Sequence, residues 1–353
     1  MALSSGLFFN GFGFFFEPLR HYFGWSRTVL SGAYSVSRAE SMVVGPILGY
    51  LIQTLGPRKV MMGAFLLFGA GFVFLSYSNS IVWFYVSFLI LSTGAEAPTF
   101  LSIMASINNW FKVKRSRAIG FAMLGLGLGG VVFPPILAFG LDNFDWRSVS
   151  LACGVFVAIF GTLISTFVRY TPERYGYFPD GIEPKLDHEV DSDAYKISGS
   201  KEIRADVPAD LEFGTMEALK TQAFWVISIG HAQALLVVSS TALHQVPYFE
   251  HGLEFSRASA AQIVMVLTAV NMLGQMLGGF LADRFPKNTV AAGTIVGHSV
   301  AMLVLAVANS YIWVLVYAVI QGLSWGVRSP VLTSMRGEYF GRKSFPAILG
   351  TSQ

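Results

Sequence analysis

Long apolar runs alternate with short charged segments along the whole chain. An apolar run of about 17–25 residues is long enough for a helix to cross a bilayer. We interpret as membrane spans the runs 2–16, 28–53, 60–77, 81–108, 118–141, 149–168, 222–246, 259–282, 289–308 and 311–334, with one more beginning at Phe345. The first run is short and has neither a charged leader nor a small-residue cleavage site, so it does not read as a signal peptide. The pattern predicts an all-α polytopic membrane protein.

One polar interval, residues 170–221, is long enough to be a cytoplasmic linker. Residues on either side of it repeat each other. Ser26-Arg27 recurs as Ser256-Arg257 (256 − 26 = 230), and Trp110-Phe111 recurs as Tyr339-Phe340 (339 − 110 = 229). The chain therefore reads as one unit copied twice in the same direction, with an N-terminal half at 1–169 and a C-terminal half at 222–353.

The composition agrees with a membrane protein and excludes several other classes. Of 353 residues, 53% are hydrophobic and 13% are charged, about half the charged share of a soluble domain. The net charge of +3 is spread over short loops, so nucleic acid is not an expected partner. The single cysteine, Cys153, forms no intrachain disulfide and no thiolate metal site. We expect no metal and no cofactor.

Lys and Arg are distributed unevenly between alternate loops. They gather at 58–59, 112–117, 284–287 and 336–343, whereas the loops at 79–80 and 309–310 have none. Because positive residues stay on the cytoplasmic side, we expect the N-terminus and the linker to be cytoplasmic. The expected location is the plasma (inner) membrane.

Four short motifs resemble one family of transporters. The runs FGWSR at 23–27, GPILG at 45–49 and GPR at 56–58 resemble the start of major facilitator transporters of the monocarboxylate and oxalate/formate branch. The run GFLADR at 279–284 is similar to that superfamily's loop motif G-x-L-x-D-R. The resemblance implies two parallel six-helix halves, of which helices 11 and 12 extend beyond this sequence. It also implies that Asp283, Arg284 and Arg58 hold the cytoplasmic ends of the halves together.

Two departures from the family's pattern have consequences. Gln53-Thr54 stands where the first copy of the loop motif would carry an acid and a base, so we expect unequal gating contacts in the two halves. Asn271 and Gln275 stand in the eighth span, where the branch often carries an Asp and an Arg for the substrate carboxylate. Both are candidates for a supporting role at the substrate site.

Four charged residues lie inside predicted spans, and each is costly there unless it is paired or faces water. They are Arg38, Glu40, Glu96 and Arg328. Two acids and two bases suggest pairing, either as internal salt bridges or as a cavity that binds an ionic substrate or relays a proton. Shifted by 230, Glu96 falls two residues from Arg328, and each precedes a proline by two positions. We expect this pair to face each other across the halves, where a proline bends each helix.

The other candidate residues are ranked by position. Arg38 shares a helix face with Ser31 and Ser35, and its guanidinium can grip a carboxylate with two parallel hydrogen bonds. Glu40 lies on another face and is expected at a helix-packing interface. His244 ends the seventh span and could titrate near the outer mouth.

These observations favour a secondary active transporter of a small, monocarboxylate-like organic anion, driven by protons or by exchange. The sequence has no G-x-x-x-x-G-K-[ST] phosphate loop, which argues against an ATP-driven pump. It shows no nucleophile–base constellation at a membrane face, which argues against an enzyme. The alternatives are a transporter of another small metabolite or drug-like solute, and a non-transporting receptor on the same scaffold.

Overall fold

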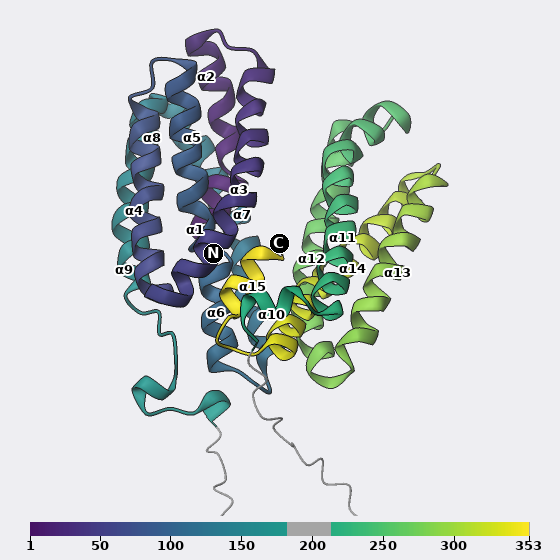
Figure 1. The fold of residues 1–353 in the computed structure, drawn as a ribbon. Coiled ribbons are helices and arrows are strands. Elements are labelled where there is room, and N and C mark those ends of the chain that lie inside the picture. The colour runs from purple at the N-terminus through teal and green to yellow at the C-terminus, as the bar shows by residue number, and fades with distance from the viewer. Residues whose placement is uncertain (182–212, 353) are drawn as a thin grey trace, which may run out of the picture.

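The computed structural model describes residues 1–181 and 213–352 (Figure 1). Its long helices form two groups, one from the first part of the chain and one from the last part. The polar residues at 201–206 of the predicted linker lie outside the described residues.

The elements follow one another as helices joined by short connections. The first group comprises α1 (Ala2–Ser4), η1 (Ser5–Phe9), η2 (Phe12–Phe15), α2 (Phe16–Phe23), α3 (Arg27–Leu55), α4 (Pro57–Ser76), α5 (Ile81–Glu96), α6 (Leu101–Trp110), α7 (Arg115–Asn143), α8 (Trp146–Phe156), η3 (Val157–Gly161) and α9 (Thr162–Ser165). The short elements η4 (Glu173–Tyr175), η5 (Pro179–Gly181) and α10 (Thr215–Leu219) follow. The second group comprises α11 (Gln222–Pro247), η6 (Tyr248–Gly252), α12 (Arg257–Arg284), α13 (Lys287–Ala306), α14 (Tyr311–Phe340) and α15 (Phe345–Thr351).

Serine caps set where several of these helices begin. The hydroxyl oxygens of Ser26, Ser80 and Ser256 each accept a hydrogen bond from the backbone N–H three residues later, at 3.3, 3.2 and 3.2 Å. Such a bond satisfies one of the N–H groups that a helix start leaves without a partner.

The internal repeat is confirmed by the helix boundaries. The helices α3, α4, α5 and α7 begin at residues 27, 57, 81 and 115, and α12, α13, α14 and α15 begin at 257, 287, 311 and 345. Each difference is 230, for example 257 − 27. The two groups are therefore copies of one helical unit in the same chain direction.

Within the described part of the chain, eight helices are long and apolar enough to cross a membrane. The predicted span 81–108 corresponds to α5 and α6 together, and the other seven correspond to single predicted spans with ends shifted by a few residues. The first predicted span is wrong in detail. Instead of one helix over 2–16, short turns run to Phe23 with a break after Phe9, where Gly11 and Gly13 weaken helical structure.

The two prolines that follow embedded charges behave differently. Before Pro98, α5 ends at Glu96, and α6 starts at Leu101. By contrast, α14 runs without interruption through Pro330. The predicted bend at both positions therefore breaks the helix only in the first group.

An aromatic core holds the first group together. Phe8, Phe12 and Phe15 from the first turns are buried and pack against Phe72 and Phe88, among others. The ring centroids of Phe12 and Phe88 lie 4.8 Å apart in an edge-to-face arrangement, which adds to the free energy of area burial. This core fixes α4 and α5 relative to the N-terminal turns.

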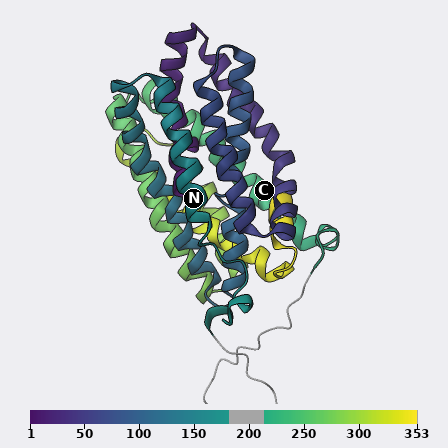
Figure 2. The same ribbon diagram turned by 90° about the vertical axis from the view of Figure 1, so that its left-hand side faces the viewer.

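The two groups meet at one end and diverge toward the other (Figure 1). In Figure 2 the long helices of both groups run in roughly the same direction. Glycines allow the backbones of the two groups to touch where the groups meet. A Cβ atom added to Gly120 of α7 would lie 2.5 Å from the carbonyl oxygen of Gln275. A Cβ atom added to Gly49 of α3 would lie 2.5 Å from the carbonyl oxygen of Pro346. These approaches leave no room for a side chain. The contact end carries α10 and α15.

Candidate functional site

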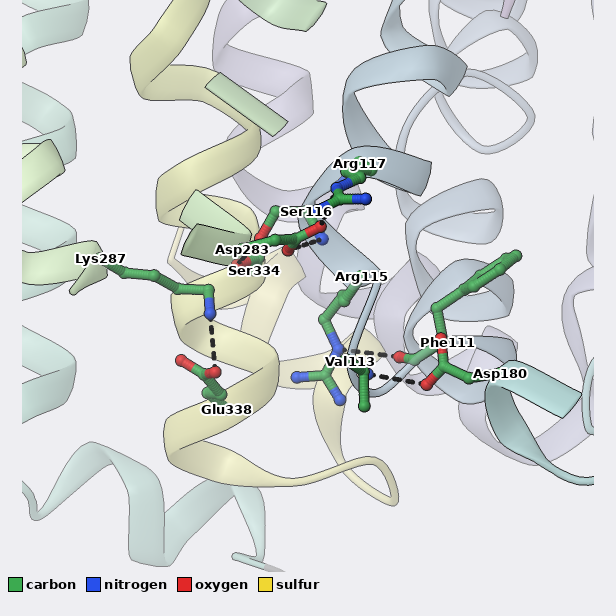
Figure 3. A network of polar contacts seen from close by, with 10 residues as sticks. All are labelled: Phe111, Val113, Arg115, Ser116, Arg117, Asp180, Asp283, Lys287, Ser334 and Glu338. Carbon is green, nitrogen blue, oxygen red and sulfur yellow. Dashed lines mark hydrogen bonds and ion pairs between the residues drawn. The ribbon is translucent and has the colours of Figure 1, made fainter. Parts of the chain in front are cut away.

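Asp283, in the last turn of α12, binds the start of α7 in the other group (Figure 3). Its carboxylate accepts hydrogen bonds from the backbone N–H groups of Ser116 at 3.1 Å and Arg117 at 3.2 Å. The Arg117 Nε lies 3.3 Å from the same carboxylate, and the Asp283 side chain is only 4% exposed. Because a helix start presents unsatisfied N–H groups and a partial positive charge, this carboxylate joins the two groups electrostatically.

Further contacts close the same end. The hydroxyl of Ser116 donates to that of Ser334 on α14 at 2.8 Å, and both side chains are buried. Arg342, in the turn between α14 and α15, donates to Glu173 at 3.0 Å and to the Asn109 carbonyl oxygen at 2.5 Å. We call the contacts made by Asp283, Ser334 and Arg342 across the two groups the gate.

The first part of the predicted linker adds a second carboxylate beside α7. Asp180 accepts from the backbone N–H groups of Lys112, Val113 and Lys114 at 2.6, 2.7 and 3.2 Å. Figure 3 shows Asp180 and Asp283 on opposite sides of the chain that enters α7. Two acidic side chains from separate elements therefore fix this helix start.

Of the three residues predicted to hold the cytoplasmic ends together, only Asp283 joins the two groups in the described part of the structure. Asp283 lies in the gate, whereas Arg58 and Arg284 are exposed and make no gate contact among the described residues. The basic partner in the gate is Arg117, which sequence reasoning counted only as a loop charge. The helix α7 begins at Arg115, and this start presents Arg117 to Asp283.

The embedded acids of the first group bind hydroxyls. Glu40 on α3 accepts from Thr93 on α5, and Glu96 at the end of α5 accepts from Ser41 on α3. Arg38 is exposed and lies within electrostatic range of Glu96. The α3–α5 interface therefore contains two carboxylates, their hydroxyl donors and one neighbouring guanidinium.

The embedded bases of the second group lie on α14. Arg328 is 1% exposed and donates to the ring Nδ1 and the carbonyl oxygen of His231 on α11, at 3.3 and 3.4 Å. Arg336 is 2% exposed and donates to the carbonyl oxygens of Leu332 at 3.5 Å and Ser352 at 3.1 Å. The Nε groups of both arginines are buried without a hydrogen-bond partner.

The predicted ion pair between Glu96 and Arg328 is not formed in this conformation. Glu96 contacts α3 and Arg328 contacts α11, so each charge is held within its own group. None of the four embedded charges predicted from the sequence makes an ion pair with another among the described residues. Glu96 and Arg328 occupy nearly equivalent positions in the two repeats, but the two groups diverge beyond the gate, so the side chains do not meet.

Arg336 lies in a buried helical position that its sequence pattern did not predict. The tenth predicted span ended at 334, so Arg336 counted as a charge of a cytoplasmic loop. Because α14 continues to Phe340, Arg336 is instead a buried helical residue. Arg336 stands in a run of charged and polar residues that reaches Lys343, and such a run predicts a loop rather than a buried helix end.

The remaining candidates lie apart from these charges. Asn271 and Gln275 on α12 are buried and bind each other, with the Gln275 Nε2 donating to the Asn271 Oδ1 at 3.0 Å. His244 is exposed and lines a cavity of about 440 Å³ between α11 and α13. Within residues 1–181 and 213–352, no group of three His, Cys, Asp or Glu side chains is placed to hold a metal ion.

Replacing Arg38 tests its predicted role as an anion ligand. We expect Arg38→Ala to abolish uptake of the substrate anion while the amount of folded protein stays near wild type, because the side chain is exposed and supports little packing. Arg38→Lys should also transport poorly, since an ammonium group cannot form the planar fork of a guanidinium. Uptake by purified variants in proteoliposomes measures both, and normal transport by Arg38→Ala would exclude the role.

Comparisons with known proteins agree with this architecture. The Major Facilitator Superfamily profile matches residues 1–352. Monocarboxylate transporter 13 of Rattus norvegicus is 25% identical over 353 residues, covering 98% of this chain and 74% of the relative. The oxalate:formate antiporter of Oxalobacter formigenes is 24% identical over 356 residues, covering 97% and 75%. The solved proton:xylose symporter XylE, bound to 6-bromo-6-deoxy-D-glucose, superposes with a TM-score of 0.66 at 15% identity, over 99% of this chain and 84% of that one. This last likeness concerns the fold alone.

Proposed function

The chain belongs to the Major Facilitator Superfamily, and on that premise we propose that it is a secondary active transporter of a small, monocarboxylate-like organic anion. It is a multi-pass integral membrane protein and not an enzyme, as its family and its transporter relatives indicate. The relatives named for monocarboxylates and for oxalate and formate support an anionic substrate.

The observation that carries the proposal is the buried, uncompensated charge of Arg328. A guanidinium inside a membrane protein is costly unless a counter-charge is present. No carboxylate among the described residues lies within ion-pair distance of it, and the hydrogen bonds that it donates to these residues go to His231 alone. A substrate carboxylate supplies the missing negative charge and matches the geometry of guanidinium donors.

The α3–α5 interface is the proposed site of coupling to protons. Glu96 and Glu40 accept hydrogen bonds from hydroxyls rather than from bases. A carboxyl group in such surroundings can hold a proton without breaking an ion pair. Exchange of one anion for another is the other mode of coupling, and it needs no titrating group.

The gate supports transport by alternating access. The Lys and Arg residues of the loops gather at the gate end, so this end is the cytoplasmic one under the positive-inside rule. The conformation is then closed to the cytoplasm and open outward, in a plasma (inner) membrane with a cytoplasmic linker. A contact made in one state and lost in the other shifts the equilibrium between them.

Transport into proteoliposomes tests the proposal. We expect purified protein to take up ¹⁴C-labelled lactate, formate or oxalate with saturable kinetics. An inward proton gradient should raise accumulation if protons are coupled, whereas internal unlabelled anion should raise it if exchange operates. Uptake no greater than in protein-free liposomes under both conditions, for all three anions, would contradict the proposed function.

Binding without uptake separates the transporter from the receptor alternative. If any of the three anions stabilises the purified protein against heat, by mass action on the folded state, but none crosses the bilayer, a receptor on the same scaffold is the better description. The matched control is a panel of neutral solutes of similar size, which the anion site should not bind.

A further inference from the structure

Arg336 carries a second uncompensated buried charge on the same helix as Arg328. Its side chain is 2% exposed, and its hydrogen bonds among the described residues reach only two backbone carbonyl oxygens. The Nε group has no partner, and no carboxylate of the described residues forms an ion pair with it. Neutral carbonyl groups lower the cost of burying a guanidinium but do not cancel its charge.

The two arginines lie near each other on α14. They are eight residues apart on α14, about 12 Å along a helix that rises 1.5 Å per residue, and that spacing keeps them within one helical stripe. Both lie within electrostatic range of His231 on α11. Arg336 therefore lies on the same side of α14 as Arg328, further toward the end of the helix.

Arg336 lies at the level of the gate. Ser334, two residues earlier, holds Ser116 of the other group. Ser352, whose carbonyl oxygen accepts from Arg336, follows α15 directly, and α15 contacts α3 and α6 of the other group closely enough that Gly49 touches Pro346. Arg336 therefore lies beside the contacts that must separate for the gate to open.

We propose that Arg336 is a second anion-binding position, which holds the carboxylate of the transported anion on the cytoplasmic side of Arg328. This rests on the proposed function, because it requires that an organic anion passes the gate. An anion that leaves Arg328 toward the cytoplasm meets Arg336 next along α14. Two positions of moderate affinity let an ion enter and leave more readily than one tight position.

The test compares the two faces of the membrane. Influx into right-side-out vesicles and into inside-out vesicles is measured with whichever of lactate, formate or oxalate the wild-type protein carries. In Arg336→Gln we expect the KM at the cytoplasmic face to rise at least tenfold. Lys59→Gln, which removes an exposed positive charge at the same end, should leave the KM within about twofold of wild type at both faces.

A locked gate isolates the outer position. In a Cys153→Ala background, Ser116→Cys and Ser334→Cys place two thiols where hydroxyls lie 2.8 Å apart, and oxidation closes the gate covalently. In this locked protein, the Kd for the same anion should be equal within about twofold with and without Arg336→Gln. Because the locked gate blocks access from the cytoplasm, the Kd of the locked protein measures anion binding at Arg328.

Several results would overturn the inference. If the KM at the cytoplasmic face is unchanged in Arg336→Gln, Arg336 is a packing residue. If the KM rises equally at both faces, or if the Kd of the locked protein rises, Arg336 belongs to the outer position. If Arg336→Gln does not fold, Arg336→Lys decides: a severalfold rise of the cytoplasmic KM supports the inference and an unchanged KM refutes it. Absence of all saturable uptake by the wild type refutes the proposed function itself.

Discussion

Arg328→Gln is expected to weaken anion binding without unfolding the protein. A hydrogen bond to a charged group contributes about 1.5–3 kcal/mol, and each 1.4 kcal/mol is tenfold in affinity. The Kd for the transported anion should therefore rise about 10- to 100-fold, with a matching loss of uptake. Because no carboxylate is left behind when the guanidinium is removed, the melting temperature of the anion-free variant should equal or exceed that of wild type.

The control for this variant keeps the charge and changes the geometry. Arg328→Lys should retain part of the affinity, since an ammonium group offers charge but no planar pair of donors. Wild-type Kd in Arg328→Gln would refute the assignment of Arg328 to the anion site. So would a melting temperature several degrees lower in the absence of anion, because it would show that Arg328 stabilises the fold by more than its two hydrogen bonds to His231.

The structure also changes what a double variant should do. An ion pair between Glu96 and Arg328 predicts that Glu96→Gln combined with Arg328→Gln recovers stability. Since the two side chains bind Ser41 and His231 instead, the effects of the single variants on stability should add. Recovery in the double variant would show that the pair forms in another conformation.

Asp283→Ala is expected to open the gate. The variant loses two backbone hydrogen bonds at the start of α7 and the ion pair with Arg117. A lost helix cap costs about 0.5–2 kcal/mol, and the lost charge at the helix start adds about 0.3–1 kcal/mol. Because these contacts exist only while the gate is closed, the equilibrium should shift about tenfold toward the state open to the cytoplasm.

Labelling of a buried gate position measures this shift. Ser334→Cys in a Cys153→Ala background provides one thiol, which is shielded in the closed gate. Its rate of reaction with a maleimide added from the cytoplasmic side should rise about tenfold with Asp283→Ala. The matched control is Glu338→Ala, which removes an exposed carboxylate that pairs with Lys287 inside the second group. Equal labelling rates in both variants would exclude Asp283 as a gate residue.

The class of protein, the internal repeat and the approximate ends of most helices could be predicted from the residues alone. Span lengths follow from the thickness of the bilayer, and caps such as Ser26 and Ser256 act locally, so both can be read along the chain. The offsets of 229 and 230 between repeated residues predicted the offset of 230 between the helix starts of the two groups. The G-x-L-x-D-R run also identified Asp283, because its position at the end of α12 is set by neighbours in the sequence.

Which charged side chains meet depends on how the helices pack. Arg117 binds Asp283 across the groups, Arg328 binds His231 on α11, and Glu96 binds Ser41 on α3. These partners come from helices far apart in the sequence, and their choice depends on how far the two groups diverge above the gate. Arg336 shows the same limit most clearly. A charge two residues past an apolar run reads as a loop residue, and only the continuation of α14 and its contact with Ser352 after α15 bury it, because burial depends on neighbours that no local pattern encodes.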